Sequence, residues 1–327
     1  MSRASYTYLD ESDWRARIAG AERLCCSCSL CPRGCGVDRP AGGKGFCGAG
    51  AGMRISSIFP HHGEEPPISG AGGSGTVFFS HCTLRCVFCQ NYQISHQGEG
   101  AEYTVEELAR RMVWLQECGC CNVNLVTPTH YLPWILRALH AASAQGLGIP
   151  VVYNCGGYER EEVLRLLDGI VDIYLPDMKY GDNRAAGRLS GADDYVEVNR
   201  RAIREMFRQV GPLNCDSSGM ALRGLLIRHL VLPNGHGGSG KVVEFLAGHF
   251  DPDDIAVSVM AQYAPRYRAG EHPEIARRIS REEYERARAW FEDAGFGGYY
   301  QDAPRMDESF LIDFTRRKFE RLGGESS

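Results

Sequence analysis

The sequence has no long hydrophobic run and no excess of positive charge. None of its apolar stretches approaches the roughly 18 residues that a membrane-spanning helix needs, so no membrane span is expected. Lysine and arginine number 36 against 41 aspartates and glutamates, which gives a formal net charge of −5. This balance provides no electrostatic reason to expect a nucleic acid or an anionic membrane as a partner.

The first 23 residues also lack the apolar segment of a signal peptide, because they are polar and carry Asp10, Glu11, Asp13, Arg15 and Arg17. Hydrophobic residues at 43% and charged residues at 24% are ordinary values, which excludes a disordered or fibrous protein. We therefore expect a globular protein in the cytoplasm, where thiols stay reduced.

Cysteine is abundant, and its distribution is uneven. Nine of the 14 cysteines lie between Cys25 and Cys89. In a reducing compartment, clustered cysteines more often bind metal ions or iron–sulfur clusters than form disulfides. The cysteine spacing therefore carries the functional signal of this sequence.

The chain divides into two parts by composition. Residues 8–23 have the pattern of a short amphipathic helix, and residues 24–75 are rich in Gly, Pro and Cys without a sustained period. We expect residues 1–75 to form a small cap that ligands hold together more than a hydrophobic core does. Residues 76–327 would then form the main body with C-terminal helices.

The main body alternates short apolar runs with helical patterns. The runs are 76–80, 122–126, 151–153, 173–175, 225–232 and 256–260, and the helical segments are 104–118, 132–145, 160–167, 195–210, 241–250 and 280–294. Six such units predict an α/β fold with a parallel sheet and crossover helices. Six units, not eight, favour a partial (β/α)6 barrel or an open sheet, with functional groups at the C-terminal ends of the strands.

Three cysteines follow the first apolar run with the spacing C-x3-C-x2-C, at Cys82, Cys86 and Cys89. Three thiolates on one loop can hold three irons of a 4Fe–4S cluster and leave the fourth iron open to a small chelating molecule. A structural zinc site is the alternative, but it would need a fourth ligand from elsewhere in the chain.

With the aromatic Phe88 directly before its last cysteine, this triplet resembles the signature of the radical S-adenosylmethionine (SAM) superfamily. Along nearly the whole chain, the sequence resembles an uncharacterised branch of pyruvate-formate-lyase-activating-enzyme-like proteins. The motifs that carry this likeness are Cys28-Ser29-Leu30-Cys31-Pro32-Arg33-Gly34-Cys35-Gly36-Val37, Gly45-Phe46-Cys47-Gly48 and Met260-Ala261-Gln262-Tyr263. The resemblance implies a partial barrel of the radical SAM type.

The resemblance also implies a reaction. The open iron would chelate SAM, and one electron from a reductant such as flavodoxin or ferredoxin would cleave the sulfonium to yield a 5′-deoxyadenosyl radical that abstracts hydrogen. The substrate could be a glycine of a partner enzyme that becomes a glycyl radical. Alternatives are a small molecule or peptide as substrate, or a non-catalytic iron–sulfur electron carrier.

Several residues are candidates for SAM binding. We expect Phe88 to pack on adenine, while Asp177 and Lys179 resemble the SAM and cation site of the activating enzymes. Asn154, Gly156 and Gly157 end the third run, where glycines allow a close approach of the backbone. Arg228 within the fifth run is costly to bury unpaired, so it binds either the SAM carboxylate or a structural ion partner. The residues expected nearer the substrate are Gln262 and Tyr263.

One segment departs from the pattern of the activating enzymes. They carry Gly-Gly-Glu after the second strand, where this chain has Val126-Thr127-Pro128-Thr129-His130. Thr127 and Thr129 can supply hydroxyl and carbonyl acceptors to the SAM ammonium, but no carboxylate is present. His130 is either a substrate-side acid/base or an ordinary loop histidine.

A second group of cysteines precedes the main body. Cys28, Cys31, Cys35 and Cys47 follow the pattern C-x2-C-x3-C-x11-C, which fits one more metal centre, either zinc or an auxiliary 4Fe–4S cluster. We prefer this set because it matches the resembling branch, and Cys25 or Cys26 can replace one member. The remaining cysteines are interpreted as buried small residues, namely Cys118, Cys120, Cys121, Cys155 and Cys215.

Overall fold

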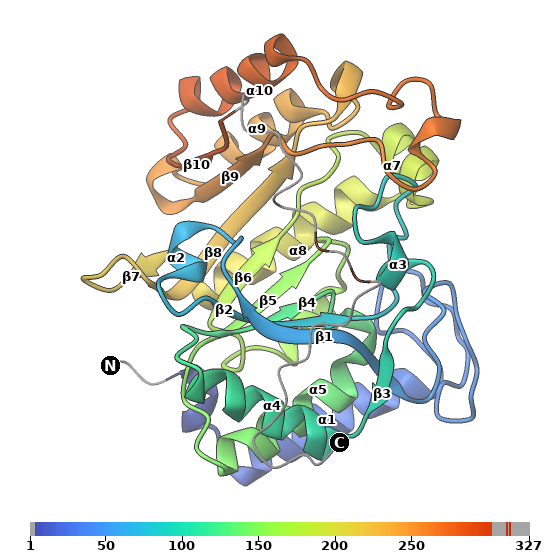
Figure 1. The fold of residues 1–327 in the computed structure, drawn as a ribbon, viewed down its shortest axis with the longest axis vertical. Coiled ribbons are helices and arrows are strands. Elements are labelled where there is room, and N and C mark those ends of the chain that lie inside the picture. Colours follow the sequence, from blue (N-terminus) through green and yellow to red (C-terminus); the bar gives the residue numbers. More distant parts are fainter. Residues whose placement is uncertain (1–3, 303–311, 313, 315–327) are drawn as a thin grey trace.

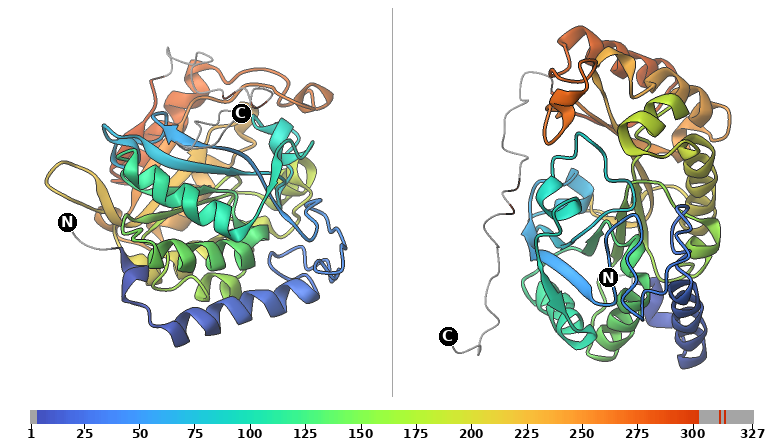
Figure 2. Two further views of the ribbon diagram at one scale, coloured as in Figure 1. Left: turned by 60° about the horizontal axis from the view of Figure 1, so that its bottom comes forward. Right: turned by 90° about the vertical axis from the view of Figure 1, so that its right-hand side faces the viewer.

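The computed structural model describes residues 4–302, Ile312 and Phe314 (Figure 1). Within them, ten strands form one sheet in the order β10-β9-β8-β6-β5-β4-β2-β1-β3, with β7 paired to β8. Helices pack on the outside of the curved sheet (Figure 2). The predicted α/β fold with a mostly parallel sheet is confirmed, and it is consistent with a partial barrel.

All six predicted apolar runs form parallel strands. They are β2 (Ser74–Phe79), β4 (Val123–Val126), β5 (Val151–Cys155), β6 (Ile173–Pro176), β8 (Ala221–Leu230) and β9 (Ala256–Met260), and within this set each strand is parallel to the next. Their central residues are buried because helices cover the outer face and the barrel interior covers the other. Their C-terminal ends therefore meet at one edge.

The crossover helices also lie where their sequence patterns predict them. They are α4 (Val105–Glu117), α5 (Leu132–Ala144), α6 (Glu161–Arg165), α8 (Tyr195–Val210), α9 (Ser239–Ala247) and α10 (Arg281–Asp293). A capping box starts α4, since Thr104 Oγ1 accepts from the Glu107 amide at 3.1 Å and Glu107 accepts in return from the Thr104 amide at 2.7 Å.

The N-terminal part contains one correction. Helix α1 (Glu11–Cys26) agrees with the predicted amphipathic helix, but the expected absence of regular structure from residue 24 to 75 is wrong. Met53–His61 form β1, which pairs antiparallel with β2, and β3 (Ala101–Tyr103) pairs with β1 in turn. The buried Ser56 and Ser57 interrupt the apolar pattern, so its period did not reveal the strand.

Because β1 belongs to the same sheet as the main body, the sheet itself does not divide the chain after residue 75. The division into a cap and a main body stays a proposal, and it concerns the cysteine-rich loop that precedes β1.

Short elements without a strong sequence signal complete the fold. They are η1 (Ser5–Tyr8), α2 (Pro66–Ser69), α3 (Tyr92–Ser95), η2 (Thr129–Tyr131), α7 (Asn183–Ser190), β7 (Asn214–Cys215), η3 (Pro233–Gly235), η4 (Pro252–Asp254), η5 (Ala269–Glu271) and β10 (Gly298–Tyr300). Strand β10 extends the parallel sheet beyond β9. Among the described residues, no helix combines the length and the apolar character needed to cross a bilayer.

Candidate active site

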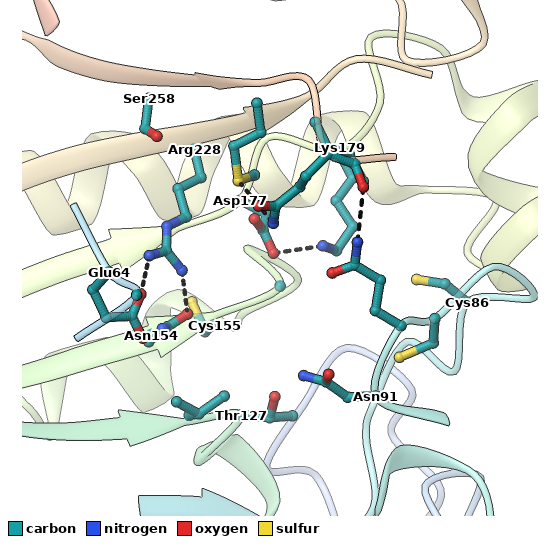
Figure 3. Close-up of a pocket in the computed structure, with 18 of the residues that line it drawn as sticks. Glu64, Cys86, Asn91, Thr127, Asn154, Cys155, Asp177, Lys179, Arg228 and Ser258 are labelled. Atoms are coloured by element: carbon teal, nitrogen blue, oxygen red, sulfur yellow. Dashed lines mark hydrogen bonds and ion pairs between the residues drawn. The ribbon is translucent and has the colours of Figure 1, made fainter. Parts of the chain in front are cut away.

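A cavity of about 660 Å³ opens at the C-terminal ends of the parallel strands and extends into the partial barrel. Loops that follow β2, β4, β5, β6 and β9 contribute to its wall, as does the segment between β1 and α2. Figure 3 shows side chains from these elements pointing into a common space. This is where parallel α/β folds place their ligands.

The three cysteines of the predicted cluster loop all line this cavity. Each sulfur accepts a hydrogen bond. The Leu84 amide donates to Cys82 Sγ at 3.4 Å, Ser190 Oγ donates to Cys86 Sγ at 3.0 Å, and Ser95 Oγ donates to Cys89 Sγ at 3.1 Å. Hydrogen bonds of this kind support thiolate ligands and tune the reduction potential of the cluster that they hold.

The donor chemistry of the loop fits a 4Fe–4S cluster. Burial raises the pKa of Cys82 to about 12 and that of Cys89 to about 11, and coordination to a cationic iron would deprotonate such thiols. Across the described ranges, no three or more His, Cys, Asp or Glu side chains converge as they would on a single metal ion. A cluster differs from an ion in this respect, because each of its thiolates binds a different iron.

Phe88 lies in the cavity wall beside the cysteines, and 4% of it is exposed. Its ring packs edge-on against Tyr263 at 5.7 Å and Tyr180 at 6.4 Å between centroids. Gln262 and Tyr263 also line the cavity, and Gln90 Nε2 donates to the Gln262 carbonyl at 3.0 Å. The structure therefore brings these predicted residues to the cysteine loop.

Asp177 and Lys179 form an ion pair inside the cavity, with Lys179 Nζ 2.5 Å from Asp177 Oδ2 (Figure 3). Both side chains are largely buried, at 19% exposed for Lys179 and 16% for Asp177. Burial alone would lower the pKa of Lys179, but the Asp177 carboxylate raises it above its ordinary value. The lysine is therefore cationic where it faces the cavity.

The glycines after β5 permit the close approach that their position predicted. A Cβ on Gly156 would lie 2.6 Å from Leu84 Cδ1, and a Cβ on Gly157 would lie 2.1 Å from the Asp177 carbonyl oxygen. Gly157 also has a φ of +70°, which favours glycine. The two glycines thus allow the loop after β5 to pack against the loops that carry the cysteines and Asp177.

Arg228 makes an ion pair with two glutamates that the sequence patterns did not reveal. Its Nε donates to Glu65 Oε1 at 2.8 Å, its Nη2 contacts carboxylate oxygens of both Glu64 and Glu65, and its Nη1 lies 3.5 Å from Asn154 Oδ1. Burial opposes ionisation of Glu65, yet the guanidinium keeps the pKa of Glu65 below its ordinary value. Of the two alternatives for Arg228, the structure describes the ion pair.

Glu64 and Glu65 were missed because they belong to the segment interpreted as a ligand-held cap. Two adjacent acidic residues before Pro66 and Pro67 were the available signal, but nothing local shows that they face an arginine more than 160 residues away. Cys155, interpreted as a spare buried thiol, also lines the cavity.

The segment that replaces Gly-Gly-Glu divides between the cavity and the core. Thr127 lines the cavity, and its amide donates to the Asn154 carbonyl at 2.8 Å. Thr129 and His130 are buried outside the cavity wall, where Thr129 donates to Glu159 at 2.8 Å and His130 Nε2 lies 2.8 Å from the Ser80 carbonyl. The ordinary structural role of His130 is therefore supported.

Thr127 adopts a left-handed backbone with φ of +58°, which is rare for a β-branched residue. Such conformations cost of order 1–3 kcal/mol and gather at functional sites. We expect Thr127→Gly to raise the free energy of unfolding by about 1 kcal/mol, after the entropy cost of glycine is subtracted. Thr127→Ala removes the same hydroxyl without providing glycine's freedom and should give no such gain. Urea unfolding of both variants tests this, and equal stability would contradict it.

The four cap cysteines are neighbours outside the cavity wall, but, as elsewhere among the described residues, no three of them converge as they would on a single metal ion. Burial raises the pKa of Cys31, and the neighbouring Cys47 and Cys28 thiols add to the rise. Burial also raises the pKa of Cys47, to which Cys28 and Cys35 contribute. A Cβ on Gly45 would lie 2.7 Å from Cys35 Sγ, so the glycine leaves room for that sulfur.

The cap packs against the cluster loop through Arg33. Its Nε donates to the Thr83 carbonyl at 3.0 Å and its Nη2 to the Ser190 carbonyl at 2.7 Å, while its guanidinium stacks on Phe46 at 3.9 Å. The cap is thus fixed directly behind Cys86, whose sulfur accepts from Ser190.

Three comparisons with known proteins bear on this site. Residues 76–216 match the profile of the Radical SAM superfamily. An uncharacterized protein of Methanocaldococcus jannaschii, MJ0674, is 33% identical over 284 residues, which is 83% of this chain and 76% of that protein.

Two solved structures resemble the fold at low identity. A radical SAM methyltransferase from Sphaerobacter thermophilus has a TM-score of 0.44 and 14% identity over 69% of this chain and 65% of its own. Methylornithine synthase has a TM-score of 0.43 and 15% identity over 95% of this chain and 89% of its own. The chain spans just under two thirds of the methyltransferase's length.

Proposed function

Because the chain belongs to the radical SAM superfamily, we propose that it is an enzyme that abstracts hydrogen from a substrate bound in the cavity described above. Membership implies reductive cleavage of SAM with a 4Fe–4S cluster. One observation carries the proposal: the three thiols of residues 82–89 line the same cavity as the buried Asp177–Lys179 pair.

The chain's own residues have distinct proposed roles. Cys82, Cys86 and Cys89 would hold three irons of the cluster, which when bound supplies one electron to SAM. Lys179 presents a cation suited to the SAM carboxylate, and Phe88 presents an aromatic ring suited to adenine. Tyr195 positions this group, because its hydroxyl accepts from the Lys179 amide at 3.0 Å and lies 2.9 Å from the Gly156 carbonyl.

The substrate is proposed in two forms. A glycine of a partner enzyme follows from the likeness to activating enzymes, whereas the absence of Gly-Gly-Glu after β4 favours a small molecule or peptide. A pure electron carrier needs neither a cavity nor the buried Asp177–Lys179 pair, which argues against the non-catalytic alternative. Flavodoxin or ferredoxin is the proposed reductant. The clustered thiols require a reducing compartment, so a cytoplasmic location is part of the proposal.

The test is anaerobic reconstitution with iron and sulfide, followed by dithionite and SAM. We expect 5′-deoxyadenosine to form in proportion to reconstituted protein. If the loop of residues 82–89 holds a complete four-iron cluster and no 5′-deoxyadenosine forms, the proposed function is refuted. To separate the two substrate classes, candidate partner enzymes are incubated with the reduced protein and examined for a glycyl radical by paramagnetic resonance.

A second metal centre in the cap is part of the proposal, with zinc and a 4Fe–4S cluster as its two alternatives. Cys47→Ala should lower the metal content of reconstituted protein by the equivalent of one centre, because Cys47 is buried beside Cys28 and Cys31. Cys118→Ala, at an exposed position, is the matched control. Full retention of iron and zinc in Cys47→Ala would contradict this set of ligands.

A further inference from the structure

The cysteine loop has one side that belongs to the cavity wall and one that does not. Leu84, Cys86 and Phe88 line the cavity, whereas Arg85 and Val87, which alternate with them, do not. Groups that contact this outer side of the loop lie next to the proposed cluster ligands without entering the cavity. Another molecule can therefore come close to the ligands there while the cavity stays available for SAM and substrate.

Two exposed aromatic side chains border the outer side of the loop. Phe46 is 42% exposed and Tyr267 is 39% exposed, and neither lines the cavity. The ring centroid of Tyr267 lies 4.3 Å from that of His96, whose Nε2 is 3.0 Å from the Cys86 carbonyl oxygen. Arg85 Nη1 donates to the Phe46 carbonyl at 3.4 Å. A protein that covered either ring would therefore lie one side chain away from the cysteine loop.

The backbone on the outer side adopts rare conformations. Among the described residues other than glycine, five have a positive φ, and Arg85 at +53° and Tyr267 at +52° are two of them. The segment that carries Tyr267 is fixed to the loop, because the Arg268 amide donates to the Val87 carbonyl at 2.9 Å. Such strained residues gather at functional sites, and contacts in the cavity do not account for these two, since neither lines it.

Three cations on the outer side have no carboxylate partner among the described residues. Arg33 and Arg85 donate to backbone carbonyls, and Lys44, two residues before Phe46, is exposed. A fourth cation, Arg268, pairs with Glu271. The chain as a whole is acidic, with a formal net charge of −5, so these unpaired cations are a local feature and do not reflect its composition. Figure 1 shows α3 and the blue loop of the cap, which carry this side, on the same side of the molecule.

We propose that the outer side of the cysteine loop is the docking face for an acidic flavodoxin, which donates the electron that the proposed reaction needs. The docking face consists of Phe46, Tyr267, Arg33, Lys44 and Arg85. Its cations suit the negative surface of an acidic protein, and its exposed rings suit the apolar edge of a flavin. One electron leaves the reduced flavin and enters the cluster, and no covalent bond forms or breaks.

The position of the docking face favours an electron donor over a protein substrate. A glycine of a partner enzyme must enter the cavity to react, and none of the five residues of the docking face lines the cavity. An electron donor only has to come close to the cluster, and such complexes have small, transient interfaces. A ferredoxin has no flavin edge to meet Phe46 and Tyr267. This inference rests on the proposed function, because it names the partner for that reaction.

The experiment measures binding of oxidised flavodoxin to reconstituted protein by calorimetry, without SAM or reductant. Wild-type protein should bind it, and more weakly as ionic strength rises, because salt screens the charges. At low ionic strength Lys44→Glu should bind about three- to tenfold more weakly, since an attractive charge becomes repulsive. Tyr267→Asn removes the ring, keeps a residue that tolerates the left-handed backbone, and should also weaken binding. Arg281→Glu, the same change of charge at an exposed residue of α10, is the matched control and should bind like wild type.

Nucleoside formation connects binding to electron transfer. With limiting photoreduced flavodoxin, Lys44→Glu should form 5′-deoxyadenosine more slowly than wild type, whereas dithionite, which needs no docking face, should support equal rates. No binding to wild type, equal binding to wild type and Lys44→Glu, an equal loss in Arg281→Glu, or tighter binding of a ferredoxin than of flavodoxin would overturn the proposal. Nucleoside formed with dithionite would then leave the proposed function standing, whereas none from a protein with a complete cluster would refute that function itself.

Discussion

Replacing Cys86 by alanine is expected to reduce 5′-deoxyadenosine formation to the rate seen without protein. Cys86 is buried, lines the cavity and accepts a hydrogen bond from Ser190 at 3.0 Å, which fits its proposed role as a ligand of the cluster. With two thiolates left, the loop cannot hold three irons, so the variant would lack the cluster that supplies the electron to SAM. The measurement is nucleoside yield per protein after reconstitution, together with iron content.

Two controls make this result specific. Cys118→Ala removes an exposed thiol and should leave the nucleoside yield unchanged. Ser190→Ala removes only the hydrogen bond to the Cys86 sulfur and should retain the cluster with a shifted reduction potential. Full nucleoside yield from Cys86→Ala would exclude this triplet as the cluster site and, with it, the proposed chemistry.

Replacing Arg228 by leucine is expected to lower the free energy of unfolding by about 3–5 kcal/mol, because two buried carboxylates lose their shared counter-charge. The side chains of Arg228, Glu64 and Glu65 are 14%, 8% and 7% exposed, so water screens the loss only slightly. Arg268→Leu, which breaks an exposed pair with Glu271, should have little effect. Chemical denaturation of the reconstituted protein measures both.

The triple variant Glu64→Gln, Glu65→Gln, Arg228→Leu separates charge from packing. Removal of both carboxylates should recover most of the stability lost in Arg228→Leu, since no uncompensated charge remains. If the triple variant is as unstable as Arg228→Leu, then packing and not charge accounts for the loss.

The ion pair between Arg228 and Glu65 makes the stability of the protein depend on pH. Because Arg228 keeps the pKa of Glu65 below its unfolded value, the folded state binds fewer protons there, and the stabilisation is fully present above the unfolded pKa. It is lost as the pH falls through the lowered pKa of the folded state. Wild-type protein should therefore lose stability in acid by this route, whereas Arg228→Leu should show a smaller loss over the same range.

Sequence patterns predicted the parts of this protein that depend on neighbours along the chain. The six parallel strands and their helices were found from local periodicity. The triplet Cys82, Cys86 and Cys89 was predicted because all its members lie on one loop, where spacing alone limits the geometry. Asp177 and Lys179 were predicted from the likeness of this pair to the site in the activating enzymes.

Other features were missed because they depend on contacts between distant segments. Strand β1 has serines inside its buried stretch, and only pairing with β2 and β3 makes it a strand. Thr127, Thr129 and His130 are nearly adjacent, yet one faces the cavity and two face the core, which depends on a left-handed turn at Thr127.

By itself, the sequence determined the α/β class and predicted a cluster-binding loop and a cysteine-rich cap, because periodicity and cysteine spacing are local properties of a chain. Only the tertiary structure decided what surrounds the three cysteines of that loop. Glu64 and Glu65 face Arg228 because β1 folds back against β2 and brings the segment after it to the barrel interior. Whether a buried charge is compensated depends on which distant groups share its low-dielectric surroundings, and that is a property of the folded chain.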